Sequence, residues 1–297
     1  MRYGFLAPAA LAAALATTPA AGQQLTFMMN LDAPHYDPHR TSAGTTADIL
    51  FMLGDTLTTV DFDLKTVKPL LAESWTVSPD GKLYTFKLRE DVSFCSGKKM
   101  TAEDVVYSFK RATSPEVKSP FAWRMGKVKD VRATGPYTVE YELAEPFNEL
   151  PLQLSNYQGT IVNKENVEKL GQDFGVKGFD GTGPYCWVSW EPRSQLVAKR
   201  HEAYKWGPPI YENRGPAKFE RFVMKIVPEE SARVAAMLSG QVDASFTMPD
   251  QAIPTLEKAP TVAVHRPAAN QRLFYLGFKT TRENVSDPRV RTALAQA

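Results

Sequence analysis

The sequence predicts an α/β fold in which mixed sheets are accompanied by helices, and three observations predict it. Apolar residues alternate at 75–77 and at 84–88 on either side of Asp80-Gly81, a dipeptide typical of hairpin turns. Thr101 is followed three positions later by Asp104, the pattern of a helix start. From about residue 181 onward, strand-like and helix-like segments follow one another instead of forming a meander of hairpins.

The first 22 residues have the features of a cleavable secretory signal. Arg2 supplies the positive start, residues 5–16 form an apolar run, and residues 20–22 are small. The run breaks at Thr17, short of the roughly 20 apolar residues that a membrane helix needs. We therefore expect export to the periplasm, with an uncleaved N-terminal anchor as the alternative.

Alternation, capping and breaker residues place the other elements before residue 181. The helix that begins at Thr101 is expected to end at Ser114-Pro115, because proline cannot continue a helix. The remaining elements are a strand at 25–29, a helix from about Thr46, a hairpin of 129–133 with 137–143, and a short helix at 164–170 between Asn163 and Gly171.

The part after residue 181 is predicted to alternate more regularly. Its elements are strands at 185–190, 196–199 and 219–226, a helix at 229–238, a strand at 242–246, a helix at 253–258, and strands at 262–265 and 273–278. Asp287-Pro288 then opens another helix, and the sequence stops at Ala297 within its apolar part. We expect the chain to be part of a longer protein.

The two cysteines, Cys95 and Cys186, fit an exported chain as one disulfide, and two separate buried thiols are the alternative. Neither belongs to a CxxC pair, which counts against a metal or redox-catalytic role. His35 and His39 are four residues apart, but the prolines beside them disfavour a helix and hence a preformed zinc pair. We expect no metal site.

Composition and missing motifs exclude several functions. Lysine and arginine number 35 against 33 acidic residues, and the signs are mixed along the chain, so we expect no nucleic-acid partner. The chain contains no GxSxG motif and no phosphate-loop lysine motif. Gly181-Thr-Gly183 opens a strand and lacks the third glycine of a dinucleotide fingerprint. We therefore expect no cofactor and no enzyme activity.

Several short motifs follow one another in a recognisable order. They are Ala72-Glu-Ser-Trp75, Ser78-Pro-Asp-Gly81, Tyr84-Thr-Phe86, Phe94-Cys-Ser-Gly97, Met100-Thr-Ala-Glu-Asp104, Gly181-Thr-Gly-Pro-Tyr185, Leu238-Ser-Gly-Gln-Val-Asp243, Tyr275-Leu-Gly-Phe278 and Asp287-Pro-Arg-Val-Arg291. In this order they resemble the peptide/nickel-type (family 5) solute-binding proteins of bacterial ABC importers. The resemblance spans nearly the whole mature chain.

The resemblance implies a type II periplasmic-binding-protein-like fold, with two lobes joined by a hinge. Residues 23–49 and 173–268 would form lobe I, and residues 50–172 a subdomain inserted into it. Residues 269–297 would form the crossover and the start of a truncated lobe II. In similar peptide-binding proteins, the groups that recognise the charged ends of the ligand come mostly from that second lobe.

The resemblance also bears on the cysteines and on function. Cys95 stands where the family usually has histidine, and Cys186 directly follows the motif ending at Tyr185, so this paired departure favours the disulfide. The implied function is that of a monomeric extracytoplasmic receptor which delivers a solute to the transmembrane subunits of an ABC permease. A short peptide is the first ligand class, followed by sugars or opines and then a metal chelate. The alternatives are a secreted hydrolase and a binding protein that serves a chemoreceptor or sensor.

Candidate ligand contacts are sought on loops, which commonly carry binding groups. The loop with Ser42, Gly44, Thr45 and Thr46 resembles the one that lines the cleft in dipeptide-binding relatives, and a plain helix start is its alternative. Trp123 resembles a cleft tryptophan of nickel-binding relatives, and packing within the subdomain is its alternative. The other candidates are Arg124, Tyr157 with its neighbours Asn156 and Gln158, Tyr36, and His39.

Overall fold

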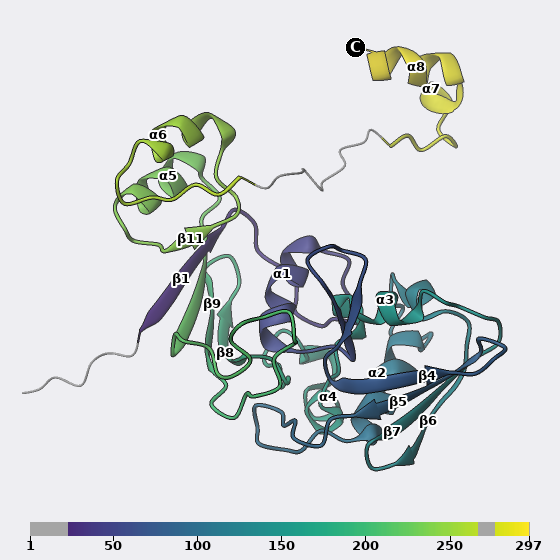
Figure 1. The fold of residues 1–297 in the computed structure, drawn as a ribbon. Helices are drawn as coiled ribbons and strands as arrows, with labels where there is room; N and C mark the ends of the chain where they lie inside the picture. The colour runs from purple at the N-terminus through teal and green to yellow at the C-terminus, as the bar shows by residue number, and fades with distance from the viewer. Residues whose placement is uncertain (1–22, 267–276, 297) are drawn as a thin grey trace, which may run out of the picture. The chain divides into compact units, whose positions relative to one another are not determined.

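The computed structural model describes residues 23–266 and 277–296 (Figure 1). The predicted signal at residues 1–22 lies outside the described residues. The chain forms two compact units, Met1–Ala252 and Ile253–Ala297. None of the helices in the described ranges has both the length and the apolar character required to cross a bilayer.

A five-stranded mixed sheet holds the N-terminal strand, in the order β11-β1-β10-β9-β8. Strand β1 (Gln24–Met29) runs parallel to β10 (Arg221–Ile226) and to β11 (Ala244–Ser245). Strand β9 (Gln195–Arg200) is antiparallel to β10 and to β8 (Tyr185–Glu191). The predicted combination of mixed sheets with helices is therefore confirmed.

A second, antiparallel sheet has the order β4-β5-β7-β6. Its strands are β4 (Ala72–Val77), β5 (Leu83–Leu88), β6 (Val128–Gly135) and β7 (Thr138–Leu143). Both predicted hairpins are present, and Gly81 has a φ of 70°, the left-handed conformation that favours glycine in the turn.

Helix α2 (Ala102–Thr113) begins and ends where the sequence predicts. The Asp104 carboxylate accepts a hydrogen bond from the Thr101 N–H (3.1 Å) and another from Lys98 Nζ (2.7 Å). This capping box satisfies backbone groups that the first turn of a helix leaves without partners. Val105 and Phe109, one helical turn apart, are buried and hold α2 in the core beside the second sheet.

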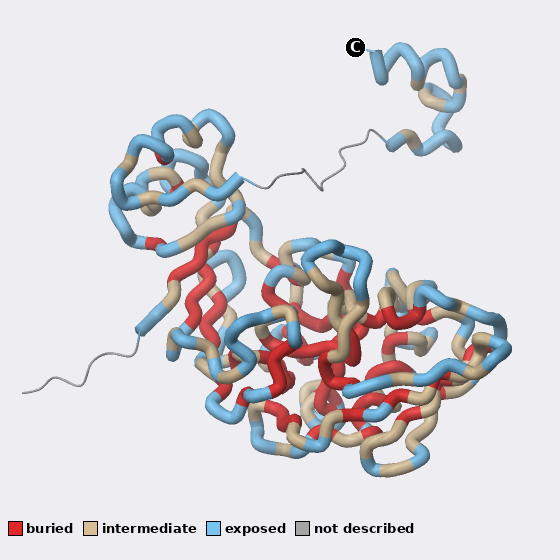
Figure 2. The backbone as a smooth tube through the Cα atoms, in the orientation of Figure 1, coloured by how far each residue is buried: buried red, intermediate tan, exposed pale blue. Residues whose placement is uncertain are grey.

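Two hydrophobic cores stabilise the first unit, and Figure 2 shows buried residues along strands of both sheets. One core joins the second sheet to α2 and includes Tyr84, Phe86 and Trp206. The other lies between the five-stranded sheet and helix α1 (Gly44–Leu53) and includes Leu50. The boundaries predicted for lobe I and its inserted subdomain stay predictions.

Several shorter elements complete the fold. Asn163 caps α4 by accepting a hydrogen bond from the Glu165 N–H (3.1 Å), as the sequence predicts. The helices are α3 (Leu150–Leu154), α4 (Lys164–Leu170), α5 (Glu230–Leu238), α6 (Ile253–Glu257), α7 (Glu283–Ser286) and α8 (Pro288–Gln296). A small hairpin consists of β2 (Thr58–Val60) and β3 (Val67–Pro69), and 3-10 turns include η1 (Ala122–Met125) and η2 (Tyr157–Gly159).

The strand predicted at residues 262–265 is wrong. Within the described part of the chain this segment pairs with no other strand, and the Val262 N–H donates to the Ala259 carbonyl in a turn (3.2 Å). Local β-propensity does not make a strand unless a partner accepts its backbone hydrogen bonds. The strand predicted at residues 273–278 lies mostly outside the described residues.

Candidate ligand-binding surface

The loop that leads into α1 presents an open helix start. Helix α1 has neither an acidic residue in its first turn nor a side-chain cap. Ser42 and Gly44 are exposed, whereas Thr46 is buried and its hydroxyl donates to the His35 carbonyl (3.0 Å). The Thr45 hydroxyl donates to the Asp32 carbonyl (3.4 Å). The Ala43 N–H donates to Thr41 Oγ1 (3.1 Å), so a polar group at the positive end of the helix dipole would meet the backbone of Ser42 and Gly44 on either side of it.

Tyr157 lies against the same loop. Its hydroxyl donates to the Thr41 carbonyl (3.3 Å) from the 3-10 turn η2. Burial raises the pKa of Tyr157, while the positive charge of Arg124 acts in the opposite direction. The hydrogen bond from Tyr157 therefore joins η2 to the loop before α1, although the two are distant in sequence.

Trp123 and Arg124 come from the 3-10 turn η1. The indole of Trp123 is 63% exposed, and the Arg124 guanidinium carbon lies 5.2 Å from its ring centre and 4.9 Å from that of Phe121. Arg124 Nη1 also donates to Gln153 Oε1 (3.4 Å). Arg124 is held in place by these contacts, whereas Trp123 presents a large apolar face to solvent. We call Ser42, Gly44, Trp123, Arg124 and Tyr157 the candidate surface.

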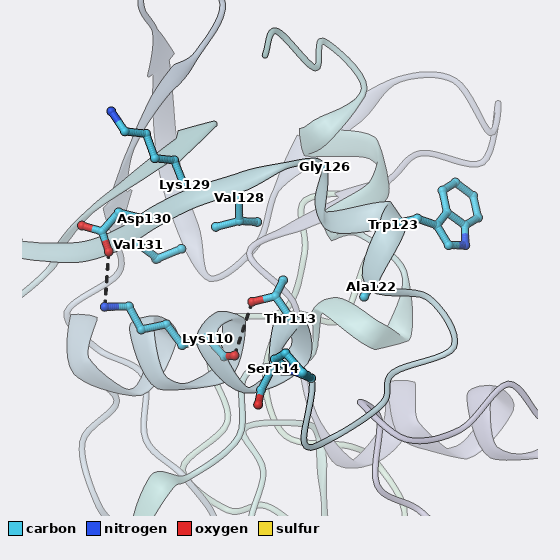
Figure 3. A pocket seen from close by; sticks show the side chains of 11 residues that line it. Lys110, Thr113, Ser114, Ala122, Trp123, Gly126, Val128, Lys129, Asp130 and Val131 are labelled. Atoms are coloured by element: carbon cyan, nitrogen blue, oxygen red, sulfur yellow. Dashed lines mark hydrogen bonds and ion pairs between the residues drawn. The ribbon is translucent and has the colours of Figure 1, made fainter. Parts of the chain in front are cut away.

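A hollow of about 570 Å³ lies between the end of α2, η1 and β6 (Figure 3). Lys110 and Asp130 form an ion pair of 3.3 Å in its wall. The indole of Trp123 extends away from the other labelled side chains in Figure 3. Trp123 lines this hollow and also presents an exposed face to solvent.

Tyr36 and His39, two further candidates from the sequence, are fully buried. The Tyr36 ring packs edge-on against Trp187 and Trp190, with ring centres 5.4 and 5.2 Å away. His39 Nδ1 lies 2.9 Å from Arg111 Nη1, and its Nε2 lies 3.3 Å from the Thr160 carbonyl oxygen. Burial and the charge of Arg111 lower the pKa of His39 to about 4. The buried rings of Tyr36 and His39 stabilise the fold through these contacts. Their contact with a ligand stays a prediction.

A buried ion pair, which no local pattern in the sequence indicates, holds this region together. Arg111 donates from Nη1 and Nη2 to the two carboxylate oxygens of Asp37, at 2.8 and 2.6 Å. The pair joins α2 to the loop that follows β1. Such a bidentate contact fixes orientation as well as distance, so it sets the position of the loop before α1.

A second hollow, of about 260 Å³, has a carboxyl group in its wall. Asp55 Oδ2 accepts a hydrogen bond from Trp206 Nε1 (3.0 Å), and Oδ1 lies 3.5 Å from the Tyr204 hydroxyl. Burial raises the pKa of Asp55 to about 7, although these hydrogen bonds oppose the shift. No motif in the sequence singles out this residue.

Replacing Asp55 with asparagine is expected to change how stability depends on pH. Because the pKa of Asp55 is raised in the folded state, there is a range between about pH 4 and pH 7 in which Asp55 is protonated in the folded protein but ionised in the unfolded chain. Stability therefore falls as pH rises through this range, by at most about 4 kcal/mol. The asparagine side chain cannot ionise, so the variant should gain stability relative to the parent between about pH 4.5 and pH 8. Urea unfolding of the parent and the variant at pH 4.5 and at pH 8 measures the difference between their free energies of unfolding. A difference that is the same at the two pH values would contradict the raised pKa of Asp55.

The predicted disulfide between Cys95 and Cys186 is present, with Cα atoms 5.6 Å apart. Cys95 precedes α2, and Cys186 lies in β8. The Cys95 N–H also donates to the Gly181 carbonyl (2.9 Å). The bridge therefore ties the segment between β5 and α2 to the five-stranded sheet.

Comparison with known proteins places these features in a wider group. The sequence profile described as "Bacterial extracellular solute-binding proteins, family 5 Middle" matches residues 66–297. The glutathione-binding protein GsiB of Salmonella paratyphi A is 27% identical over 297 residues, which are 99% of this chain and 56% of that protein. The chain thus spans about half the length of the curated relatives it matches.

Solved structures show the same fold. DppA from Helicobacter pylori, in complex with the peptide STSA, matches with a TM-score of 0.70 and 26% identity over 80% of this chain and 49% of that chain. MoaA from A.tumefacien R10, in complex with mannopinic acid, matches with a TM-score of 0.73 and 26% identity over 81% of this chain and 48% of that chain.

Proposed function

This chain belongs to family 5 of the bacterial extracellular solute-binding proteins, and we propose that it is the first lobe of a periplasmic receptor for an ABC importer. The family and the type II periplasmic-binding-protein fold confirm the two main predictions from the sequence. The observation that carries the proposal is the family match over residues 66–297. The relatives are binding proteins, consistent with a role that leaves the solute chemically unchanged.

A short peptide is the ligand class that we propose. GsiB is named for glutathione, and the DppA structure holds a peptide. The candidate surface offers an open helix start near Gly44 for a carbonyl or carboxylate, and an exposed indole at Trp123 for an apolar side chain. Enclosure between two lobes would bury most of such a ligand.

A thermal-shift screen of the full-length mature protein tests the ligand class. Short peptides including glutathione, sugars, opines and nickel chelates are added separately. A ligand that binds only the native state at 100 times its Kd adds about 2.7 kcal/mol to the free energy of unfolding, so Tm rises. We expect a rise with peptides. A rise only with an opine or chelate would reject the peptide class, and no rise with any class would reject the binding function.

Delivery to a permease is tested in cells. A strain that lacks the full-length protein should lose uptake of the ligand found in the screen, and a plasmid copy should restore it. Normal uptake together with loss of a chemotactic or signalling response would assign the protein to a sensor instead.

Replacing Trp123 with alanine is expected to weaken ligand binding by about 5- to 30-fold, the loss of one stacking or cation contact of about 1–2 kcal/mol. The Tm of the ligand-free protein should change little, because the indole is 63% exposed. Calorimetric titration measures Kd. Phe62→Ala is the matched control, since Phe62 is 71% exposed on a different turn. Equal losses in the two variants, or none in Trp123→Ala, would remove Trp123 from the site.

A further inference from the structure

Cys95, Cys186 and His201 bring three metal-binding atoms together, all within 4.8 Å of one another. The residues come from the segment before α2, from strand β8, and from the position directly after β9. In a tetrahedral zinc site, with Zn–S bonds of about 2.3 Å, neighbouring ligand atoms lie about 3.8 Å apart. The three atoms are close enough to bind one tetrahedral ion, provided that reduction lets the two bonded sulfurs move apart.

The imidazole of His201 makes the kind of second hydrogen bond that metal-binding histidines make. Its Nδ1 lies 3.0 Å from the Gly183 carbonyl oxygen, which accepts the Nδ1 proton and leaves Nε2 as the available ligand atom. A backbone carbonyl in this role fixes the tautomer and the ring plane in zinc sites.

The surroundings suit a dication with two thiolates. Cys186 and His201 are 4% and 5% exposed, whereas Cys95 is half-buried. Two thiolates cancel the charge of Zn²⁺, so the complex can be buried without a net charge. The half-exposed side at Cys95 gives an ion access and leaves room for water as the fourth ligand.

We propose that the reduced chain binds one Zn²⁺ through Cys95, Cys186 and His201, in place of the disulfide. A phosphine or dithiol reductant supplies two electrons to the S–S bond, and two protons complete the two thiols. Zn²⁺ then binds both sulfurs as thiolates and releases two protons. The ion links the same two segments that the disulfide links, so the connection between the segment before α2 and β8 survives reduction.

A zinc titration of the full-length protein, without an affinity tag, tests the proposal. The protein is reduced with a phosphine, freed of it in the absence of oxygen, and titrated with Zn²⁺ against a coloured chelator. The reduced form should bind one equivalent at least about 100-fold more tightly than the oxidised form, and zinc should raise the Tm of the reduced form alone. Equal zinc binding by the two forms would overturn the proposal.

The variant His201→Gln tests the third ligand. It should weaken zinc binding by the reduced protein at least about 10-fold, while His265→Gln, a change at an exposed histidine outside the cluster, should not. Near-UV circular dichroism of the oxidised variant checks that it folds. If the reduced parent unfolds without metal, recovery of its native spectrum on addition of zinc replaces the titration. Unchanged zinc affinity or recovery in His201→Gln would reject the three-ligand site.

Discussion

Replacing Arg111 with alanine is expected to lower the free energy of unfolding by about 3–5 kcal/mol. The Asp37 side chain is 2% exposed and accepts two hydrogen bonds from Arg111. Without the guanidinium, a buried carboxylate has no cation beside it, and His39 Nδ1 loses its donor. The cost comes mainly from the charge left behind, because burying an ion pair is itself expensive. Urea unfolding at pH 7 measures the change.

The neighbouring residue provides a matched control. Lys110 pairs with Asp130 at 3.3 Å, but the two side chains are 57% and 41% exposed. An exposed pair of this kind contributes about 0–1 kcal/mol, so Lys110→Ala should change stability by less than about 1 kcal/mol. If Arg111→Ala and Lys110→Ala lose similar amounts, the buried pair does not stabilise the fold in the way described.

Arg111→Ala should also change how the free energy of unfolding depends on pH below about pH 5. Burial alone would raise the pKa of Asp37, but the hydrogen bonds and charge of Arg111 outweigh it and lower the pKa. Because the pKa of Asp37 is lower in the folded state, this residue contributes its full stabilisation above its unfolded pKa of about 3.9. The contribution is lost as pH falls through the folded pKa. In Arg111→Ala only the charge and the backbone N–H of His39 still oppose burial, so the pKa of Asp37 should rise and its contribution should lose less stability toward acid.

Local signals in the sequence were enough to predict elements whose hydrogen bonds join residues that are only a few positions apart. The turn at Gly81 and the capping box of Thr101 with Asp104 are of this kind. Residues 262–265 have equally good strand propensity, but a strand also needs a partner, and propensity contains no information about partners. The short hairpin of β2 and β3 was missed for the opposite reason, since strands of three residues are too short for a clear alternation.

The candidate surface could be predicted only in part. Loop position identified Ser42 and Trp123, which are exposed, but it also selected Tyr36 and His39, which are buried. Their burial depends on distant residues, because His39 meets Arg111 across 72 positions of sequence. His201 was missed for the same reason: nothing near it in sequence indicates that the chain brings two cysteines to its side chain.

Removing the disulfide is expected to have an effect as large as that of Arg111→Ala. The two cysteines are 91 residues apart, and closing a loop of this length restricts the unfolded chain by about 3–5 kcal/mol in the chain-entropy description. The double variant Cys95→Ser with Cys186→Ser should therefore lose about this much free energy of unfolding at pH 7. Guanidinium unfolding of the oxidised parent and the double variant, at equal ionic strength, measures the difference.

Reduction separates the effect of the bond from the effect of changing side chains. The reduced parent, kept free of metal, should match the double serine variant within about 1 kcal/mol, because both have lost the same constraint on the unfolded chain. A much more stable reduced parent would mean that the packing of sulfur in β8, and not the closed loop, stabilises the protein. Added zinc should stabilise the reduced parent but not the double serine variant. It can restore a link only where both thiols remain, because serine hydroxyls bind zinc poorly.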